Sequence, residues 1–569
     1  MVGGPAGEGV LSASHALAKV FARAGLHVAT DGERPSLIRG GHNYNLIRAE
    51  QEKIGSKISL IDALVAMDKQ TVLLHANRIS HNGAVVYDGE EFQITPEELG
   101  RSDLRLLALP TKSIIKELGA DPHVENTVAL GALLGLLDAD LNLFLDVLKE
   151  EYVKHPDILK FDLEAARRGY DLGKAHDQFT HKITTIPGKK RLLLNGIQAI
   201  NLGALKAGVQ FVAMYPITPA TGILEGLVGL GEKQQIVVIQ PEDEISVITM
   251  ATGAAYAGAR TLVGTSGPGY ALMGEGISLA GMMEAPVVIV NSQRGGPATG
   301  LPTRTAQEDL QFVLHAGHGE FPHFVIAPHD SESCYLEIQR AFNLAERFQT
   351  PVTLLIDRFL AESLRTVDEF PTDLTIDRGQ VYSQEELDRI GQDAFRRFGN
   401  PQGGVCKRSL PGMRNGVHRL SADEHDETGT LKDAPDNRKR MVDRRAKKLV
   451  EVLKELPVPK LDGSSNAQAT LVSWGSMKPV IDDARKFLAR ENIATAHLHL
   501  TYLRPFHDQE ILNILSHVTN PILIEQNATG QLGQLIREKT GFKIAKQLLK
   551  YDGLQFLPEE LAERIKTLL

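Results

Sequence analysis

Strands and helices alternate through the middle of this chain, and that alternation restricts the possible folds more than any other feature. Short apolar runs at 210–214, 235–239 and 286–290 have the length and composition of buried strands. Segments with helical spacing of apolar residues separate these runs. The pattern predicts a parallel, doubly wound sheet over residues 191–365.

A polar or glycine-rich cluster follows each of these strands. The clusters lie at 215–219, 242–244 and 291–297, and a fourth, at 265–269, follows a shorter strand-like run. Parallel strands end at one edge of a sheet, and open α/β sheets bind their ligands at that edge. We therefore expect the main functional site between residues 214 and 305.

The rest of the chain is also predicted to be α/β, with one irregular interruption. Residues 1–180 alternate strands and helices, beginning with a glycine-rich turn at 3–9 and a helix at 10–24. Residues 366–465 contain prolines, glycines and charge runs, which predict a long, partly irregular excursion. Residues 466–569 resume the alternation of strand and helix.

The glycine-rich turn at 3–9 leaves two interpretations open. Its backbone amides could bind a phosphate at the start of the following helix, or the turn could simply be tight. Such a turn normally follows a strand, but only Met1 and Val2 precede this one. We expect either that a strand is missing or that the sheet edge there is unusually short.

Composition and charge exclude several classes of protein. A net charge of −9 argues against a general nucleic-acid-binding protein. Cys334 and Cys406 are the only cysteines, so the chain has no disulfide framework and no four-thiolate cluster or zinc site of its own. The most apolar long run, 128–148, carries three aspartates and predicts a buried helix pair, not a membrane span. We expect a protein of the reducing cytoplasm that does not enter a membrane.

Three side chains in the central stretch could carry chemistry, and each has an ordinary structural alternative. Glu244 could act chemically or cap a helix, a task that Glu242 and Asp243 could do equally. Arg294 could pair with a substrate carboxylate or form an internal ion pair. Thr218 could present its hydroxyl to an anion or serve as a turn residue.

Two other clusters of polar residues are expected to have structural roles. His315, His318 and His323 lie close together in sequence but lack the pattern of a helical zinc motif. We expect them to be structural or solvent-facing. The basic segment 438–448 predicts a solvated or interface face of a helix.

Taken together and in order, these motifs resemble those of one enzyme family. The chain is similar over nearly its whole length to the fused γ–α subunit of 2-oxoacid:ferredoxin oxidoreductases, most closely to the 2-oxoglutarate type. The matching segments are GGPAGEGV at 3–10, PSLIRGGHNY at 35–44, YPITP at 215–219, EDE at 242–244, SGPG at 266–269, GLPTRT at 300–305, LPG at 410–412, DEHDE at 423–427 and EQNATGQL at 525–532.

The resemblance implies an α/β fold with several open parallel-sheet domains. A γ-type oxidoreductase domain would span residues 1–180, and a pyrimidine-binding thiamine diphosphate domain would span 191–365. The irregular excursion 366–465 would connect this domain to a transketolase C-terminal-like domain at 466–569.

The resemblance also implies a reaction and its cofactors. The family oxidatively decarboxylates a 2-oxoacid with coenzyme A to an acyl-CoA and CO2 and reduces ferredoxin, and many members also run in the carboxylating direction. In the family, thiamine diphosphate, Mg2+ and a [4Fe–4S] cluster lie mainly on a separate β subunit. This agrees with two features that the present chain lacks, a G-D-G…N-N metal signature and cluster cysteines. An (αβ)2 heterotetramer, inactive without β, is the family's expectation.

Cofactor and substrate residues are carried over from the matching motifs. Glu244 matches the family's glutamate that hydrogen-bonds the aminopyrimidine of the cofactor and so promotes removal of the thiazolium proton. Pro216 and Ile217 would line the pocket of that ring, next to Thr218. Thr218 and Arg294 match the residues that hold the substrate carboxylate.

Substrate selection is implied for a second loop. Thr303 and Arg304 match the loop that faces the substrate in the family and helps to choose its side chain. The single-chain γ–α arrangement and the excursion motifs favour 2-oxoglutarate. Pyruvate, branched or aryl oxoacids, or a broad range of 2-oxoacids are the alternatives. Two alternatives come from other classes of protein. One is a ligase-like subunit that binds CoA or a nucleotide, with its main site at residues 3–9, and the other is a purely structural partner subunit.

Overall fold

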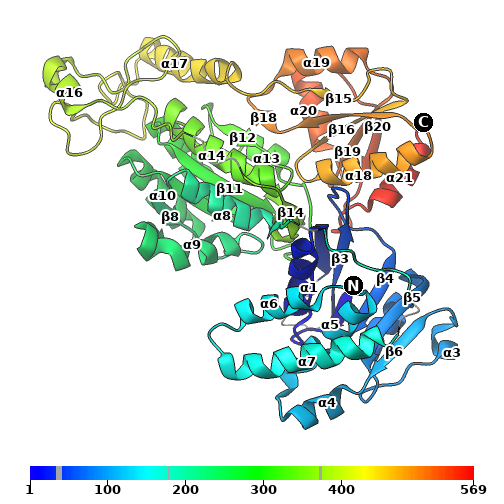
Figure 1. Cartoon of the computed structure of the whole chain (residues 1–569). Helices are drawn as coiled ribbons and strands as arrows, with labels where there is room; N and C mark the ends of the chain where they lie inside the picture. Colours follow the sequence, from blue (N-terminus) through cyan, green and yellow to red (C-terminus); the bar gives the residue numbers. More distant parts are fainter. Residues whose placement is uncertain (34–40, 177–178, 187, 371–374) are drawn as a thin grey trace. The chain divides into compact units, whose positions relative to one another are not determined.

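The structure is a computed structural model that describes residues 1–33, 41–176, 179–186, 188–370 and 375–569. It consists of two compact units (Figure 1). Unit 1 comprises residues 1–194 and 363–369, and unit 2 comprises residues 195–362 and 370–569. Residues 35–40 of the second predicted motif lie outside the described residues, and the rest of that motif begins strand β3.

Unit 1 contains an eight-stranded mixed sheet with the order β6-β5-β4-β1-β3-β2-β14-β7. Its strands are β1 (Val2–Pro5), β2 (His27–Glu33), β3 (His42–Glu50), β4 (Ile61–Ala66), β5 (Ile79–Asp88), β6 (Arg105–Leu109), β7 (Leu192–Leu194) and β14 (Arg365–Val367). Strands β1, β4, β5 and β6 are parallel, and β3 runs antiparallel to β1. Strand β1 lies between β3 and β4, so this short strand is inside the sheet and the expectation of a sheet edge there is wrong.

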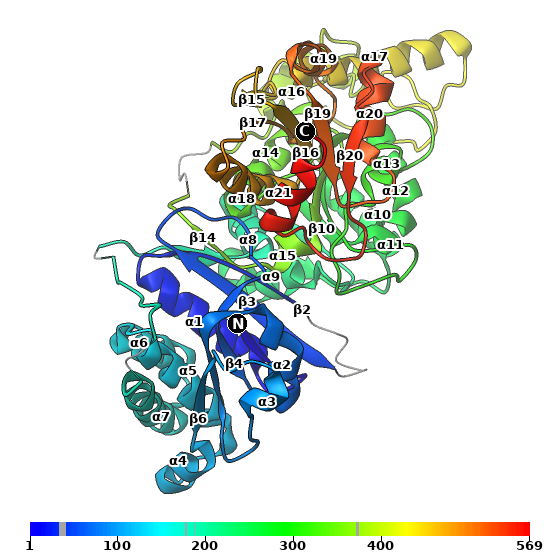
Figure 2. The same cartoon turned by 90° about the vertical axis from the view of Figure 1, so that its right-hand side faces the viewer.

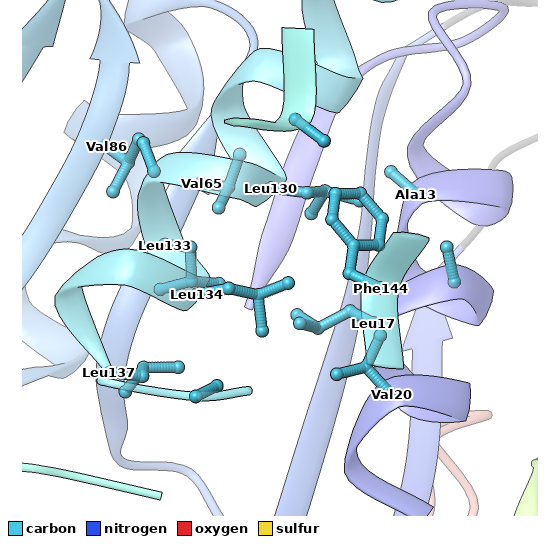
Figure 3. Close-up of a cluster of buried hydrophobic side chains, with 14 of the residues drawn as sticks. Ala13, Leu17, Val20, Val65, Val86, Leu130, Leu133, Leu134, Leu137 and Phe144 are labelled. Atoms are coloured by element: carbon cyan, nitrogen blue, oxygen red, sulfur yellow. The ribbon is translucent and has the colours of Figure 1, made fainter. Parts of the chain in front are cut away.

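Helices cover this sheet and supply most of the apolar core of unit 1. They are α1 (Val10–Arg23), α2 (Lys69–His75), α3 (Pro96–Leu99), α4 (Thr111–Leu118), α5 (Glu125–Leu136), α6 (Leu141–Glu151) and α7 (Pro156–Lys174), with short 3-10 turns at Ala76–Arg78 and Pro122–Val124. Side chains of α1, α5 and α6 pack on β4 and β5 (Figure 3). The predicted buried helix pair at 128–148 is confirmed as α5 and α6.

Helices α5 and α7 approach each other closely because both carry glycines one turn apart. A Cβ atom at Gly173 of α7 would lie 1.9 Å from the carbonyl oxygen of Ala132, and one at Gly135 of α5 would lie 2.1 Å from that of Tyr170. No side chain fits at such distances. The all-round apolar character of α5 follows from this position between α7 and the sheet.

The first sheet of unit 2 is parallel and doubly wound, as the sequence predicts. Its order is β18-β12-β13-β11-β10-β8-β9, and only β18 is antiparallel. The strands are β8 (Phe211–Ala213), β9 (Val237–Ile239), β10 (Thr261–Thr265), β11 (Val287–Gln293), β12 (Phe324–Ile326), β13 (Val352–Asp357) and β18 (Tyr502–Arg504). The chain moves outward from β8 to β9 and returns to the other side of β8 for β10, which makes the carboxyl ends of these strands a switch point.

Helices lie on both faces of this sheet (Figure 1). The helices are α8 (Gly196–Lys206), α9 (Thr221–Gln234), α10 (Glu244–Tyr256), α11 (Gly267–Leu272), α12 (Gly274–Met283), α13 (Leu310–Leu314), α14 (Ser331–Phe348) and α15 (Arg358–Glu362). Helices α8, α9 and α14 share one apolar cluster, and α10, α12 and α13 share the other. The sheet is therefore buried on both sides, which explains its continuous apolar strands.

The carboxyl-terminal part of unit 2 forms a five-stranded sheet with the order β15-β17-β16-β19-β20. Its elements are β15 (Leu461–Asp462), β16 (Ala469–Trp474), β17 (Thr495–Leu500), β19 (Pro521–Glu525), β20 (Lys546–Leu549), α18 (Met477–Arg490), α19 (Asp508–His517), α20 (Gln531–Thr540) and α21 (Pro558–Lys566). All strand pairs except β15–β17 are parallel. Helices α18 and α21 cover one face, and α19 and α20 the other (Figure 2).

The excursion contains α16 (Gln384–Ile390), a 3-10 turn (Gln392–Ala394) and the long helix α17 (Pro435–Leu453). The basic segment was predicted to be a solvated or interface face, and the solvated alternative is wrong for part of α17. Arg444 and Lys448 are buried and both pair with Glu284 at the end of α12, the lysine Nζ lying 2.5 Å from Glu284 Oε2. Arg445 is buried too and binds Glu424. The two ion pairs with Glu284 attach the excursion to the sheet domain, and the pair with Glu424 lies within the excursion.

Candidate active site

The four predicted clusters follow β8, β9, β10 and β11, which are neighbours at one edge of the sheet. The parallel register places Ala213 of β8 beside Val263 of β10 and Ile239 of β9. It also places Thr265 of β10 beside Asn291 of β11. The polar turns after these strands therefore meet at the switch point, as the sequence predicts.

Glu244 is the first residue of α10, and its neighbours do the capping. The Asp243 carboxylate accepts a hydrogen bond from the amide of Ser246 (2.8 Å), and Glu242 accepts one from the Ser246 hydroxyl (2.8 Å). Glu244 itself is 5% exposed. Asp243 thus caps the helix, which was the alternative role considered for Glu244. The Glu244 carboxyl remains available to bind a ligand.

The Glu244 carboxyl faces the backbone of the glycine-rich turn after β10. A Cβ atom at Gly269 would lie 2.4 Å from Glu244 Oε1, so the carboxyl packs directly against this residue and only glycine fits there. Burial raises the pKa of Glu244, and the neighbouring Asp243 carboxylate raises it further. A carboxyl in this setting is suited to a hydrogen bond with a neutral ring nitrogen.

Arg294 follows β11 directly and is 8% exposed. Its Nη1 donates a hydrogen bond to the carbonyl oxygen of Thr218 (2.7 Å), which brings two of the predicted substrate residues together. Its Nε is buried and has no partner among the described residues. Burial lowers the pKa of the Arg294 guanidinium. The guanidinium therefore keeps a donor without a partner among the described residues, as an arginine that binds an anionic ligand would.

The loop after β8 carries the other predicted cofactor residues. Pro216 and Ile217 are half-buried, and Ile217 packs against the apolar cluster of α8, α9 and α14. Thr218 is exposed, and its carbonyl oxygen accepts the hydrogen bond from Arg294. The Ile217 carbonyl accepts the amide of Ala220 (2.8 Å) and so closes the turn before α9.

Thr303 and Arg304 lie on a loop that folds back towards β11. The loop is closed by the Leu301 amide, which donates to the Gly295 carbonyl (2.7 Å), and by the Gly296 amide, which donates to Glu308 (2.7 Å). Both predicted selectivity residues are half-buried. The loop is thus a defined structure next to Arg294.

Sequence reasoning missed Asp309, which ends this loop. Its Oδ2 accepts a hydrogen bond from Asn291 Nδ2 (3.1 Å), and its amide donates to Gln293 (2.9 Å). Burial raises the pKa of Asp309 to about 6, against the lowering effect of Arg294. The sequence signal for a polar partner such as Asp309 is the run of four polar residues, 291–294, at the end of an otherwise apolar strand, because Asn291 and Gln293 in this run bond Asp309.

The remaining candidates are structural or still open. His323 is buried, with Nε2 3.1 Å from the Val313 carbonyl, whereas His315 contacts the Gln311 carbonyl. No group of three or more metal-ligating side chains suited to an ion occurs in the part of the chain that the structure describes. In unit 1, a Cβ atom at Gly4 would lie 2.7 Å from Met67 Cβ, so close packing favours glycine there. Phosphate binding by the turn at 3–9 stays an open alternative.

No helix among the described residues is both long and apolar enough to span a membrane.

Two family descriptions match the chain. The thiamine diphosphate-binding region of pyruvate flavodoxin/ferredoxin oxidoreductases matches residues 202–397. The pyruvate ferredoxin/flavodoxin oxidoreductase description matches residues 1–172. The first match includes the whole edge site built around Glu244 and Arg294.

Named relatives extend these matches over the full chain. The 2-oxoacid:ferredoxin oxidoreductase subunit alpha of Sulfolobus sp is 30% identical over 620 aligned positions, which cover 99% of this chain and 96% of the relative. The 2-oxoglutarate oxidoreductase subunit KorA of Mycobacterium tuberculosis is 30% identical over 89% of this chain and 81% of its own length.

A solved structure agrees with the whole fold. The 2-oxoglutarate:ferredoxin oxidoreductase from Magnetococcus marinus, determined with 2-oxoglutarate, coenzyme A and succinyl-CoA bound, has 31% sequence identity and a TM-score of 0.91. The match covers 100% of this chain and 98% of that chain. The fold and the edge site thus define an oxidoreductase subunit with a thiamine diphosphate-binding domain. The chain belongs to the family of 2-oxoacid:ferredoxin oxidoreductase α subunits.

Proposed function

We propose that the chain is the fused γ–α subunit of a 2-oxoglutarate:ferredoxin oxidoreductase. It would catalyse, with a β subunit, the CoA-dependent conversion of 2-oxoglutarate to succinyl-CoA and CO2 with reduction of ferredoxin, and could also run in the carboxylating direction. Support comes from the 2-oxoglutarate-named relative and solved structure at about 30% identity. Matches of one chain to two separate oxidoreductase descriptions, at residues 1–172 and 202–397, support the fusion.

One observation carries the catalytic assignment. Glu244 is buried, is relieved of helix capping by Asp243, and has its carboxyl against Gly269 at the carboxyl ends of the parallel strands. These residues fit an aminopyrimidine ring. When bound, thiamine diphosphate supplies the carbanion chemistry needed to decarboxylate a 2-oxoacid.

Each residue of the site has a proposed part in the reaction. Glu244 holds a proton at the ring nitrogen through its raised-pKa carboxyl. Arg294 holds the substrate carboxylate through its unused donor, and Thr218 keeps the guanidinium in place through its carbonyl. Thr303 and Arg304 contact the substrate side chain.

The partner must supply what this chain does not carry. The present chain has two cysteines, Cys334 and Cys406, which are both buried and cannot provide the four thiolates of a [4Fe–4S] cluster. We assign the cluster, the Mg2+ and the diphosphate-binding half of the cofactor site to β, in an (αβ)2 assembly. Because the reaction uses CoA and a low-potential ferredoxin, we place the enzyme in the cytoplasm.

A comparison of three oxoacids tests the proposed substrate. The chain is co-expressed with its β subunit, and CoA-dependent reduction of a low-potential dye is measured with 2-oxoglutarate, pyruvate and 2-oxoisovalerate. A clear preference for 2-oxoglutarate supports the proposal. Equal rates with all three would replace it by a broad 2-oxoacid enzyme, and no reduction with any of them would refute the reaction itself.

A further inference from the structure

The segment after the selectivity loop is bonded directly to the carboxyl-terminal part of unit 2. Gln307 is fully buried, and all of its polar groups have partners there. Its amide donates to the Gln526 carbonyl (2.7 Å), and its side-chain Nε2 donates to the Trp474 carbonyl (3.1 Å). Its Oε1 accepts the Gln526 amide (3.1 Å), and its carbonyl accepts Asn527 Nδ2 (2.9 Å).

The partner of Gln307 is itself fixed in place. Asn527 Nδ2 also donates to Glu525 (2.7 Å), and its Oδ1 accepts the Gly530 amide (2.7 Å). Glu525 is fully buried and accepts hydrogen bonds from Trp474 Nε1 (3.1 Å) and the Leu532 amide (2.8 Å). A buried, fully bonded polar network of this kind holds one geometry.

A second contact reaches the selectivity loop from the same side. The Thr305 amide donates to the Gly553 carbonyl (3.1 Å). A Cβ atom at Gly553 would lie 2.9 Å from Arg304 Cβ, and Gly553 has φ +81°, which favours glycine. The turn at Gly553 thus sets how far Arg304 extends.

The two ends of the loop are therefore positioned by different parts of the fold. Arg294 takes its place from β11 and from Thr218. The 303–307 segment is bonded to the carboxyl-terminal part of unit 2 through Gln307 and the Thr305 amide, and to α15 through the Thr305 hydroxyl, which accepts the Phe359 amide (3.2 Å). We infer that Gln307 is a positioning residue for substrate selection, through which the carboxyl-terminal domain fixes Thr303 and Arg304 against the side chain of the 2-oxoacid. This inference rests on the proposed function. Gln307 itself does not touch the substrate.

Gln311 provides a matched control. Its amide donates to Gln531 Oε1 (2.9 Å), and its Nε2 donates to the Gln531 carbonyl (2.9 Å). It joins the same two domains but lies beyond the loop. If Gln307 acted only in holding the domains together, loss of either glutamine side chain would have the same effect.

Steady-state kinetics of the αβ holoenzyme test the inference. Methionine keeps the volume of glutamine but removes its side-chain hydrogen bonds. In Gln307→Met we expect KM for 2-oxoglutarate to rise about tenfold with kcat nearly unchanged, and the preference over pyruvate to fall by a similar factor. Gln311→Met should leave the preference unchanged. Equal losses for both oxoacids, or the same change in both variants, would overturn the inference.

A second variant and a second measurement keep the test independent of turnover. Gly553→Ala should alter the preference as Gln307→Met does, because it displaces Arg304 from the domain side. Hydrogen–deuterium exchange of the purified chain should be faster at residues 303–309 in Gln307→Met but not in Gln311→Met. Unchanged exchange in Gln307→Met would overturn the positioning role. A different outcome would overturn the proposed function and not the positioning role. In that case exchange at residues 303–309 would be faster in Gln307→Met, as expected, but the wild-type holoenzyme would turn over no 2-oxoacid.

Discussion

At the scale of single residues, the site depends on three adjacent acidic side chains with different tasks. Asp243 caps α10, Glu242 binds the Ser246 hydroxyl, and Glu244 turns towards Gly269. Their spacing could not assign these tasks, because any of the three could cap the helix. The resemblance selected Glu244, and the capping geometry supports that selection.

Replacement of Glu244 by glutamine tests its part in the reaction. Glutamine keeps the size of the side chain but cannot exchange a proton, so we expect kcat to fall about 100-fold or more, with much less effect on cofactor binding. Turnover of the αβ enzyme and calorimetric titration with thiamine diphosphate provide the two measurements. Glu242→Gln serves as the control. Wild-type turnover in Glu244→Gln would remove Glu244 from the mechanism.

Arg294→Ala should act mainly on substrate binding. Loss of a charge-assisted hydrogen bond costs roughly 1.5–3 kcal/mol, so we expect KM for the oxoacid to rise about 10- to 100-fold with a smaller change in kcat. Initial rates over a range of oxoacid concentrations measure this. An unchanged KM would show that Arg294 does not hold the substrate carboxylate.

Asp309 gives the site a dependence on pH. Its pKa is raised to about 6 in the fold, above about 3.9 for an unfolded chain, so the folded state binds the proton more tightly. The group therefore costs stability above pH 6, and this cost disappears below about pH 4. Asp309→Asn should raise the urea midpoint at pH 7.5 but not at pH 4. An equal gain at both pH values would contradict this account.

At the scale of elements, strand and helix positions followed well from the sequence, whereas burial of charged residues did not. Apolar periodicity placed β8 to β13 and the helix pair α5–α6, because local spacing reflects burial directly. The basic face of α17 was predicted to be a solvated or interface face, and its burial in ion pairs was not predicted. Its partner Glu284 lies 160 residues away from Arg444 in the sequence, and no local pattern shows such a pairing.

Glu284 is expected to hold the excursion in place. Glu284→Gln leaves Arg444 and Lys448 buried without a countercharge, which costs about 3–5 kcal/mol in comparable pairs. We expect α17 to become sensitive to limited proteolysis and to exchange its amides faster. Glu275→Gln, an exposed change on the same helix, is the control. Equal protection of α17 in both variants would show that the ion pairs do not hold it.

At the scale of the whole molecule, the sequence indicated the α/β class and the location of the site at the ends of β8 to β11. It did not indicate the bonding of Gln307 to Gln526 and Asn527, because these contacts join segments more than 200 residues apart. Long-range polar contacts of this kind have no periodic signature. The family motifs supplied residue roles that spacing alone left open.

The chain carries half of the proposed active site, and reconstitution with the β subunit tests that assignment most directly. The purified chain is titrated with purified β subunit in the presence of thiamine diphosphate, Mg2+, CoA and 2-oxoglutarate, and succinyl-CoA formation is measured with a ferredoxin or dye acceptor. We predict no product from either subunit alone and a rate that saturates at one β per chain. Product formation by the chain alone, or an inactive saturated mixture that has bound the cofactor, would contradict the account.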